Sequence, residues 1–134
     1  MNLVSIRIIT EDVKGLVNFY EQVTAMSALQ YTDDFAELQT NSVTLAIGST
    51  KTLQFFGAEE VAKAAQNRTA IIEFRVQDVD DVYRRLGDFL KTYLIQEPTL
   101  MPWGNKSLLF RDPDGNLVNF FSPLTEEAIK RSKN

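Results

Sequence analysis

Two stretches of the chain carry the same pattern of apolar and polar positions. Residues 5–20 (SIRIITEDVKGLVNFY) can be laid over residues 71–86 (IIEFRVQDVDDVYRRL). In each copy, alternating apolar residues lead to an Asp-Val pair, and apolar residues at helical spacing follow that pair. Self-similarity of this kind indicates a duplicated structural unit. The pattern therefore predicts a strand, a turn and a helix in each half of the chain.

Strand-like segments follow each predicted helix. The first helix has a stripe of Val13, Leu16, Val17, Tyr20 and Val23, and the second has Val79, Val82, Tyr83 and Leu86. Asp12 is placed to cap the start of the first helix. The strand-like segments span residues 27–32, 35–40, 42–48, 92–96, 107–111 and 116–122. Each half is thus predicted to be a βαβββ module, and the fold class is α+β.

The remaining segments set the expected boundaries. We expect one domain, 1–134, with module 1 over residues 1–57 and module 2 over residues 69–123. Residues 58–68 are helical in composition and are expected to form a linker helix. Residues 124–134 are expected to form a C-terminal helix. Asp112-Pro113-Asp114-Gly115 has the residues of a tight turn, which predicts a hairpin between two apolar strands.

Composition excludes several kinds of chemistry. The 134 residues include no cysteine and no histidine, so disulfides, thiolate metal sites and histidine acid/base relays are impossible. The net charge of −4 argues against nucleic acid as a partner and favours neutral or cationic small ligands. The N-terminus lacks the pattern of a signal peptide, and no segment approaches 18 consecutive apolar residues. We therefore expect a cytoplasmic protein with no membrane partner.

These features together resemble the vicinal oxygen chelate superfamily, which includes glyoxalase, bleomycin-resistance proteins and extradiol dioxygenases. The features that match, in order along nearly the whole chain, are the first strand ending at Asp12, Phe19-Tyr20, the segment EFRVQDVDDVYRRL, Trp103-Gly104 and the segment from Phe110 to Val118. The resemblance implies two βαβββ modules whose curved sheets surround a cavity. It also implies a homodimer that binds a small molecule.

The metal-ligand positions that the resemblance implies have lost their ligands. In this chain they hold Ser5, Ile71 and Asn119, and a fourth position lies near Thr44 to Ala46 with its register open. None of these residues is a good ligand for a divalent transition metal. Asp112, Asp114 and Asn116 superficially look like a calcium loop, but the glycine falls at the wrong place, so a hairpin is favoured. We therefore expect no metal and no cofactor.

Strand alternation predicts which side chains face the cavity. Arg7 and Glu73 are equivalent positions of the two copies, opposite in charge, and we expect them to be in contact on the cavity floor. An ion pair that registers the halves is the favoured interpretation. Alternatively, Glu73 is a general base and the one candidate catalytic residue, or Arg7 anchors an anionic group of a ligand.

Three further residues are candidates for ligand binding. Asn119 presents an amide that orients a ligand or, equally, a core amide bonded to the backbone. Trp103, in the Pro-rich loop 98–104, stacks on a ligand or, equally, closes the core with Met101. Phe121 shares a strand face with Asn119. Five other phenylalanines are interpreted as core residues: Phe35, Phe55, Phe56, Phe110 and Phe120.

Two classes of function remain open. The first is a metal-independent binding protein, resembling bleomycin-resistance proteins, that sequesters an aromatic or cationic ligand in a dimeric cavity. The second is a glyoxalase-like or dioxygenase-like enzyme, a lyase or isomerase, with a non-standard site. The lost ligand positions Ser5, Ile71 and Asn119 count against the second class.

Overall fold

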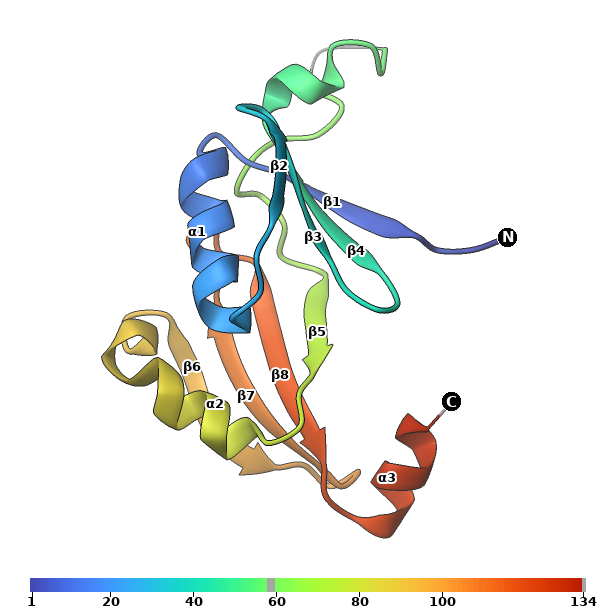
Figure 1. The fold of residues 1–134 in the computed structure, drawn as a ribbon, viewed down its shortest axis with the longest axis vertical. Coiled ribbons are helices and arrows are strands. Elements are labelled where there is room, and N and C mark those ends of the chain that lie inside the picture. The colour runs from blue at the N-terminus through green and yellow to red at the C-terminus, as the bar shows by residue number, and fades with distance from the viewer. Residues whose placement is uncertain (58–59, 134) are drawn as a thin grey trace. The chain divides into compact units, whose positions relative to one another are not determined.

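The protein consists of two compact units, each built from one half of the repeat (Figure 1). The computed structural model describes residues 1–57 and 60–133. Unit 1 holds residues 1–57, 60–67 and 113–115, and unit 2 holds residues 68–112 and 116–133. Each unit contains a four-stranded sheet with the element order βαβββ, and a further helix follows in unit 2. The predicted α+β fold of two βαβββ modules with a C-terminal helix is therefore confirmed.

Unit 1 places its first strand next to its last. The strand order is β1-β4-β3-β2, with β1 parallel to β4 and the other pairs antiparallel. A short 3₁₀ helix, η1, follows β4 in the sequence (Figure 1). The bounds are β1 Ser5–Ile9, α1 Val13–Thr24, β2 Leu29–Thr32, β3 Phe35–Gln39, β4 Thr44–Gly48 and η1 Thr50–Leu53.

Helix α1 forms where the apolar stripe predicts it and begins at its predicted cap. The Asp12 carboxylate accepts a hydrogen bond from the Gly15 backbone amide at 2.9 Å, which satisfies one of the free N–H groups of the first turn. The helix ends at Ala25, whose left-handed backbone stops the helical pattern. Its stripe is buried against β3 and β4, so this face of the sheet carries the core of unit 1.

Unit 2 repeats the arrangement with longer strands. The strand order is β5-β8-β7-β6, and β5 is parallel to β8. Its core lies between the sheet and α2, where Leu108, Phe110, Val118 and Phe120 are buried. The bounds are β5 Ile71–Arg75, α2 Val79–Leu86, η2 Gly87–Leu90, β6 Leu94–Leu100, β7 Asn105–Arg111, β8 Leu117–Pro123 and α3 Glu126–Ser132.

The predicted hairpin between β7 and β8 is held by a buried carboxylate. Asp112 is 2% exposed and accepts hydrogen bonds at 2.9 Å from both the backbone and the side-chain amide of Asn116. Gly115 supplies the positive φ of 87° that the turn needs. Within residues 1–57 and 60–133, no three Asp or Glu side chains gather closely enough to hold a metal ion. The hairpin interpretation of this motif is thus confirmed.

The linker helix is the clearest error among the predicted elements. Residues 60–68 form turns and bends, and residues 58–59 lie outside the described part of the chain. Glu60 and Ala65 have positive φ angles of 66° and 59°, which an α-helix does not accommodate. A helix this short also needs an apolar face to bury, and Val61 is 49% exposed.

Two smaller observations complete the fold. Strand β6 extends beyond residue 96 to Leu100, so Pro98 lies in a strand at the edge of the sheet, where a missing N–H is tolerated. Among the described residues, no helix is both long enough and apolar enough to cross a membrane.

Candidate functional site

The candidate site residues of unit 2 lie on the sheet face opposite α2. Lys106 reaches the α2 residue Asp80 at 2.8 Å, which places even-numbered β7 residues on the helix side. The strand register then places Glu73 of β5, Asn119 and Phe121 of β8 and Leu109 of β7 on the other side. We call this surface the Asn119 face. Sequence alternation predicted that Asn119 and Phe121 share a strand face, and the family resemblance implied that this face and Glu73 line the same cavity.

Glu73 and Asn119 are joined directly. They are register partners on β5 and β8, and the Asn119 Nδ2 group donates a 2.9 Å hydrogen bond to Glu73 Oε2. Asn119 is 8% exposed, and its Oδ1 atom has no hydrogen-bond partner among the described residues. A buried acceptor without a donor costs about 1–3 kcal/mol. The alternative in which Asn119 is bonded to the backbone is therefore wrong.

The two other predicted ligand-binding residues of unit 2 are aromatic. Phe121 is half-buried and follows Asn119 by two residues on the same face. Trp103 is 57% exposed in the turn between β6 and β7, and its carbonyl accepts a hydrogen bond from Arg131. A side chain this exposed does not close a core, so that interpretation of Trp103 is wrong. Its stacking on a ligand stays a prediction.

Arg7 lies beside two aromatic rings of unit 1. Its guanidinium lies 5.3 Å from the ring centroid of Phe35 and 5.4 Å from that of Phe56. Arg7 shares its strand face with Phe35 and Glu37 of β3, away from α1. We call this surface the Arg7 face. Arg7 and Glu73 belong to different units, and the contact between them stays a prediction.

The aromatic residues of the Arg7 face were missed by the sequence reasoning. Phe55 and Phe56 are 88% and 58% exposed, so the interpretation of these two as core residues is wrong, whereas Phe35 is half-buried. Phe110 and Phe120 are buried as expected. Alternation along residues 35–39 was a usable signal for Phe35. No sequence signal brings the residues after η1 to Arg7.

Tyr31 adds to the Arg7 face. Its ring stacks on Phe35 with the centroids 6.0 Å apart, and its hydroxyl donates to Glu37 Oε1 at 3.0 Å. The hydrogen bond to Glu37, followed by desolvation and the carboxylate's charge, raises the pKa of Tyr31. Tyr31 is therefore a neutral hydrogen-bond donor that fixes both Phe35 and Glu37.

The expected metal-ligand positions do not fit a transition metal. In unit 1 Arg7 pairs with Ala46, and in unit 2 Glu73 pairs with Asn119, so the repeat makes Ala46 the counterpart of Asn119. If the fourth position is the repeat counterpart of Asn119, it falls on Ala46 within the predicted range from Thr44 to Ala46. Ser5, Ala46, Ile71 and Asn119 then offer one hydroxyl and one amide, a donor set unlike that of zinc, iron or nickel sites.

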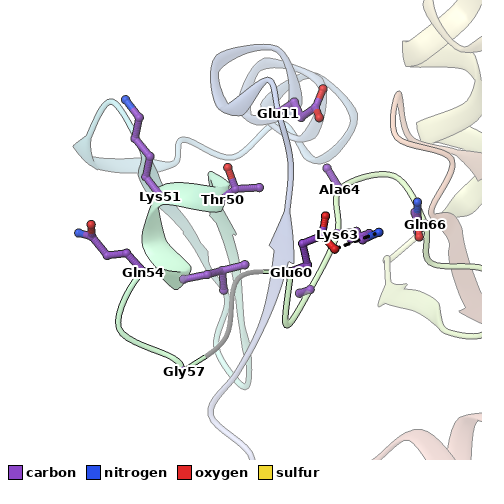
Figure 2. A pocket seen from close by; sticks show the side chains of 11 residues that line it. Glu11, Thr50, Lys51, Gln54, Gly57, Glu60, Lys63, Ala64 and Gln66 are labelled. Atoms are coloured by element: carbon purple, nitrogen blue, oxygen red, sulfur yellow. Dashed lines mark ion pairs between the residues drawn. The ribbon is translucent and has the colours of Figure 1, made fainter.

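Unit 1 also contains a separate hollow of about 590 Å³ beside η1 (Figure 2). Glu11, Lys51, Gln54, Glu60 and Lys63 are among its lining residues. Lys63 and Glu60 form an ion pair at 3.5 Å across exposed side chains, which contributes little stability. None of the predicted site residues lines this hollow. It is therefore not the candidate site.

Comparisons with known proteins agree with the fold. The family model of the Glyoxalase/Bleomycin resistance protein/Dioxygenase superfamily matches residues 2–120. The chain is 25% identical over 128 residues to the uncharacterized protein YraH of Bacillus subtilis (strain 168), covering 92% of this chain and 100% of that one.

Solved structures give the same picture. A structure described as a conserved domain protein is 28% identical, with a TM-score of 0.72, and the match covers 92% of this chain and 99% of that one. A glyoxalase/bleomycin resistance protein/dioxygenase family enzyme from Burkholderia phytofirmans PsJN is 16% identical, with a TM-score of 0.80. That match covers 92% of this chain and 100% of the other, and it supports the fold alone.

Proposed function

Because the chain belongs to the Glyoxalase/Bleomycin resistance protein/Dioxygenase superfamily, we propose that it is a metal-independent member that binds an aromatic cation. The observation that carries the proposal is the Glu73–Asn119 pair, a carboxylate beside a buried amide oxygen that has no donor within the part of the chain that the structure describes. The homodimer and the cytoplasmic location expected from the sequence are part of the same proposal.

The chemistry of the Asn119 face favours a ligand that donates hydrogen bonds. Among residues 1–57 and 60–133, the one hydrogen bond that Glu73 accepts comes from Asn119 to Oε2, and the side chain of Glu73 is exposed. The exposed carboxylate of Glu73 suits a cation with several N–H groups, and the hydrogen bond from Asn119 holds that carboxylate in place. Phe121 and Trp103 supply aromatic surface in the same unit, which suits a flat ring. The net charge of −4 also favours a cation.

Benzamidine is a suitable probe because it joins a flat ring to an amidinium group. We expect it to change the fluorescence of Trp103, the single tryptophan, in a saturable way. Glu73→Gln and Asn119→Leu should each weaken binding by about tenfold or more, because a charge-assisted hydrogen bond is lost. Glu97→Gln removes a carboxylate of the same unit that accepts from Tyr83 instead, and it should leave binding unchanged.

The outcome is decided by the difference between these variants. Thermal melts of each variant separate loss of binding from loss of structure. If Glu73→Gln lowers the melting temperature while benzamidine binding persists, the pair has only a structural role and the proposal fails. An absence of saturable binding in the unmodified protein would also reject it.

A further inference from the structure

The guanidinium group of Arg7 lies beside two aromatic rings, and its N–H groups have no hydrogen-bond partner among the described residues of unit 1. A guanidinium over one ring is a common contact, whereas here rings from two separate segments lie within 5.5 Å of the same Arg7 Cζ atom: Phe35 at 5.3 Å and Phe56 at 5.4 Å. Phe35 belongs to β3, and Phe56 follows η1. Phe56 is 58% exposed although its ring is large and apolar. These two rings therefore form an aromatic surface beside a cation.

Arg7 reaches Phe35 across β4 and passes beside Gly48. Strand β4 lies between β1 and β3, and Gly48 is the register partner of Phe35. A Cβ atom built on Gly48 would lie 3.4 Å from Arg7 Cδ. The aliphatic part of Arg7 therefore crosses β4 at a position without a side chain. Tyr31, stacked on Phe35 and bonded to Glu37, holds the far side of the cluster.

The charge of Arg7 is not used within unit 1. Among the described residues of that unit, Arg7 has no ion pair and no hydrogen-bond partner, and the nearest acidic residue on the same face, Glu37, accepts from Tyr31 and Gln39 instead. Contact with a ring uses the face of the guanidinium, whereas a carboxylate binds at its N–H edge. Arg7 is exposed, so its N–H groups are accessible within unit 1.

We propose that Arg7, Phe35 and Phe56 form a binding site for an aromatic carboxylate. The planar guanidinium edge binds the two carboxylate oxygens in a bidentate way, and the ring of the ligand packs against the exposed Phe56. This site takes a charge opposite to that of the Glu73–Asn119 pair and lies in the other unit. The benzoate experiment below reports on Arg7 and the benzamidine experiment reports on Glu73, so failure of one proposal is distinguishable from failure of the other.

Benzoate is the probe, with the Arg7 Nε–Hε signal in ¹⁵N-edited NMR as the readout. We expect a saturable shift of that signal with benzoate and a much weaker response to benzamide, which has the same ring without the charge. Arg7→Lys keeps the positive charge but loses the paired N–H donors that bind a carboxylate in a bidentate way. Phe56→Leu removes the aromatic ring. Calorimetry should show that each variant binds benzoate about tenfold more weakly.

The chain offers a matched control for each variant. Phe55→Leu alters the neighbouring ring, which is 88% exposed, and Arg84→Lys alters a guanidinium already paired with Asp81. Both should bind benzoate within about twofold of the unmodified protein, because neither side chain touches the site. The proposal is overturned if Arg7→Lys binds normally, if Phe55→Leu and Phe56→Leu weaken binding equally, or if benzamide binds as well as benzoate.

Discussion

Phe120→Ala is expected to destabilise the protein by about 3–5 kcal/mol, the largest effect of any single core truncation proposed here. Phe120 is 1% exposed in the middle of β8. Its ring makes edge-to-face contacts with Phe110 at 5.0 Å and with Phe74 at 5.4 Å between centroids. Removing it leaves a cavity between the sheet and α2 and ends both ring contacts. Asn119 is the neighbour of Phe120 on β8, and its side chain lies on the opposite face of the sheet. Packing of Phe120 in the core therefore also helps to hold Asn119 in position.

Urea unfolding followed by Trp103 fluorescence measures this loss, since Trp103 and Phe120 belong to the same unit. Phe55→Ala is the matched control: its ring is 88% exposed, and its loss should cost less than about 0.5 kcal/mol. Phe120→Leu keeps most of the volume and should cost only about 1–2 kcal/mol, which keeps the comparison measurable if the alanine variant does not fold. A cost below about 1 kcal/mol for Phe120→Ala would contradict the described core.

Asp112→Ala should cost about 3 kcal/mol, because two donors of a buried residue lose the carboxylate to which they are bonded. Asn116 is 3% exposed, and its backbone and side-chain amides both donate to Asp112. Asp112→Asn keeps one carbonyl oxygen as an acceptor, so its free energy of unfolding should fall by less than that of Asp112→Ala. Chemical denaturation of the two variants gives the order directly.

Asp33→Ala provides the control for Asp112. Asp33 is an exposed turn residue in unit 1, and its replacement should change the free energy of unfolding by no more than about 0.5 kcal/mol. If Asp112→Ala unfolds at the same urea concentration as Asp33→Ala, the carboxylate is not what holds the β7–β8 turn. The position of Asn119, three residues beyond Asn116, would then need another explanation.

The repeated pattern predicted the element order well because it reports local forces. Helical spacing, the Asp12 cap and the Asp112–Gly115 turn each act over a few residues, and each appears where expected. The helix prediction for residues 60–68 was wrong for a related reason. The composition of this segment favours a helix, but the segment has no apolar stripe to bury. Composition alone is weaker evidence than periodicity.

The site was predictable only as far as strand alternation reaches. Alternation places Glu73 and Asn119 on one face, but their direct bond depends on how β5 aligns with β8. That register joins segments more than forty residues apart and leaves no local trace in the sequence. The aromatic contacts of Arg7 depend likewise on a side chain crossing β4 at Gly48. Neither could be read from residue spacing.

The central claim is that this fold binds its ligand without a transition metal. Metal content per chain tests it most directly: the purified protein is incubated with Ni²⁺, Zn²⁺, Mn²⁺ or Fe²⁺, freed of excess ion and analysed by mass spectrometry. The account predicts far less than one ion per chain and no shift in melting temperature, for the unmodified protein and for Asn119→Leu alike. One retained ion per chain that is lost in Asn119→Leu or Glu73→Gln would contradict the account.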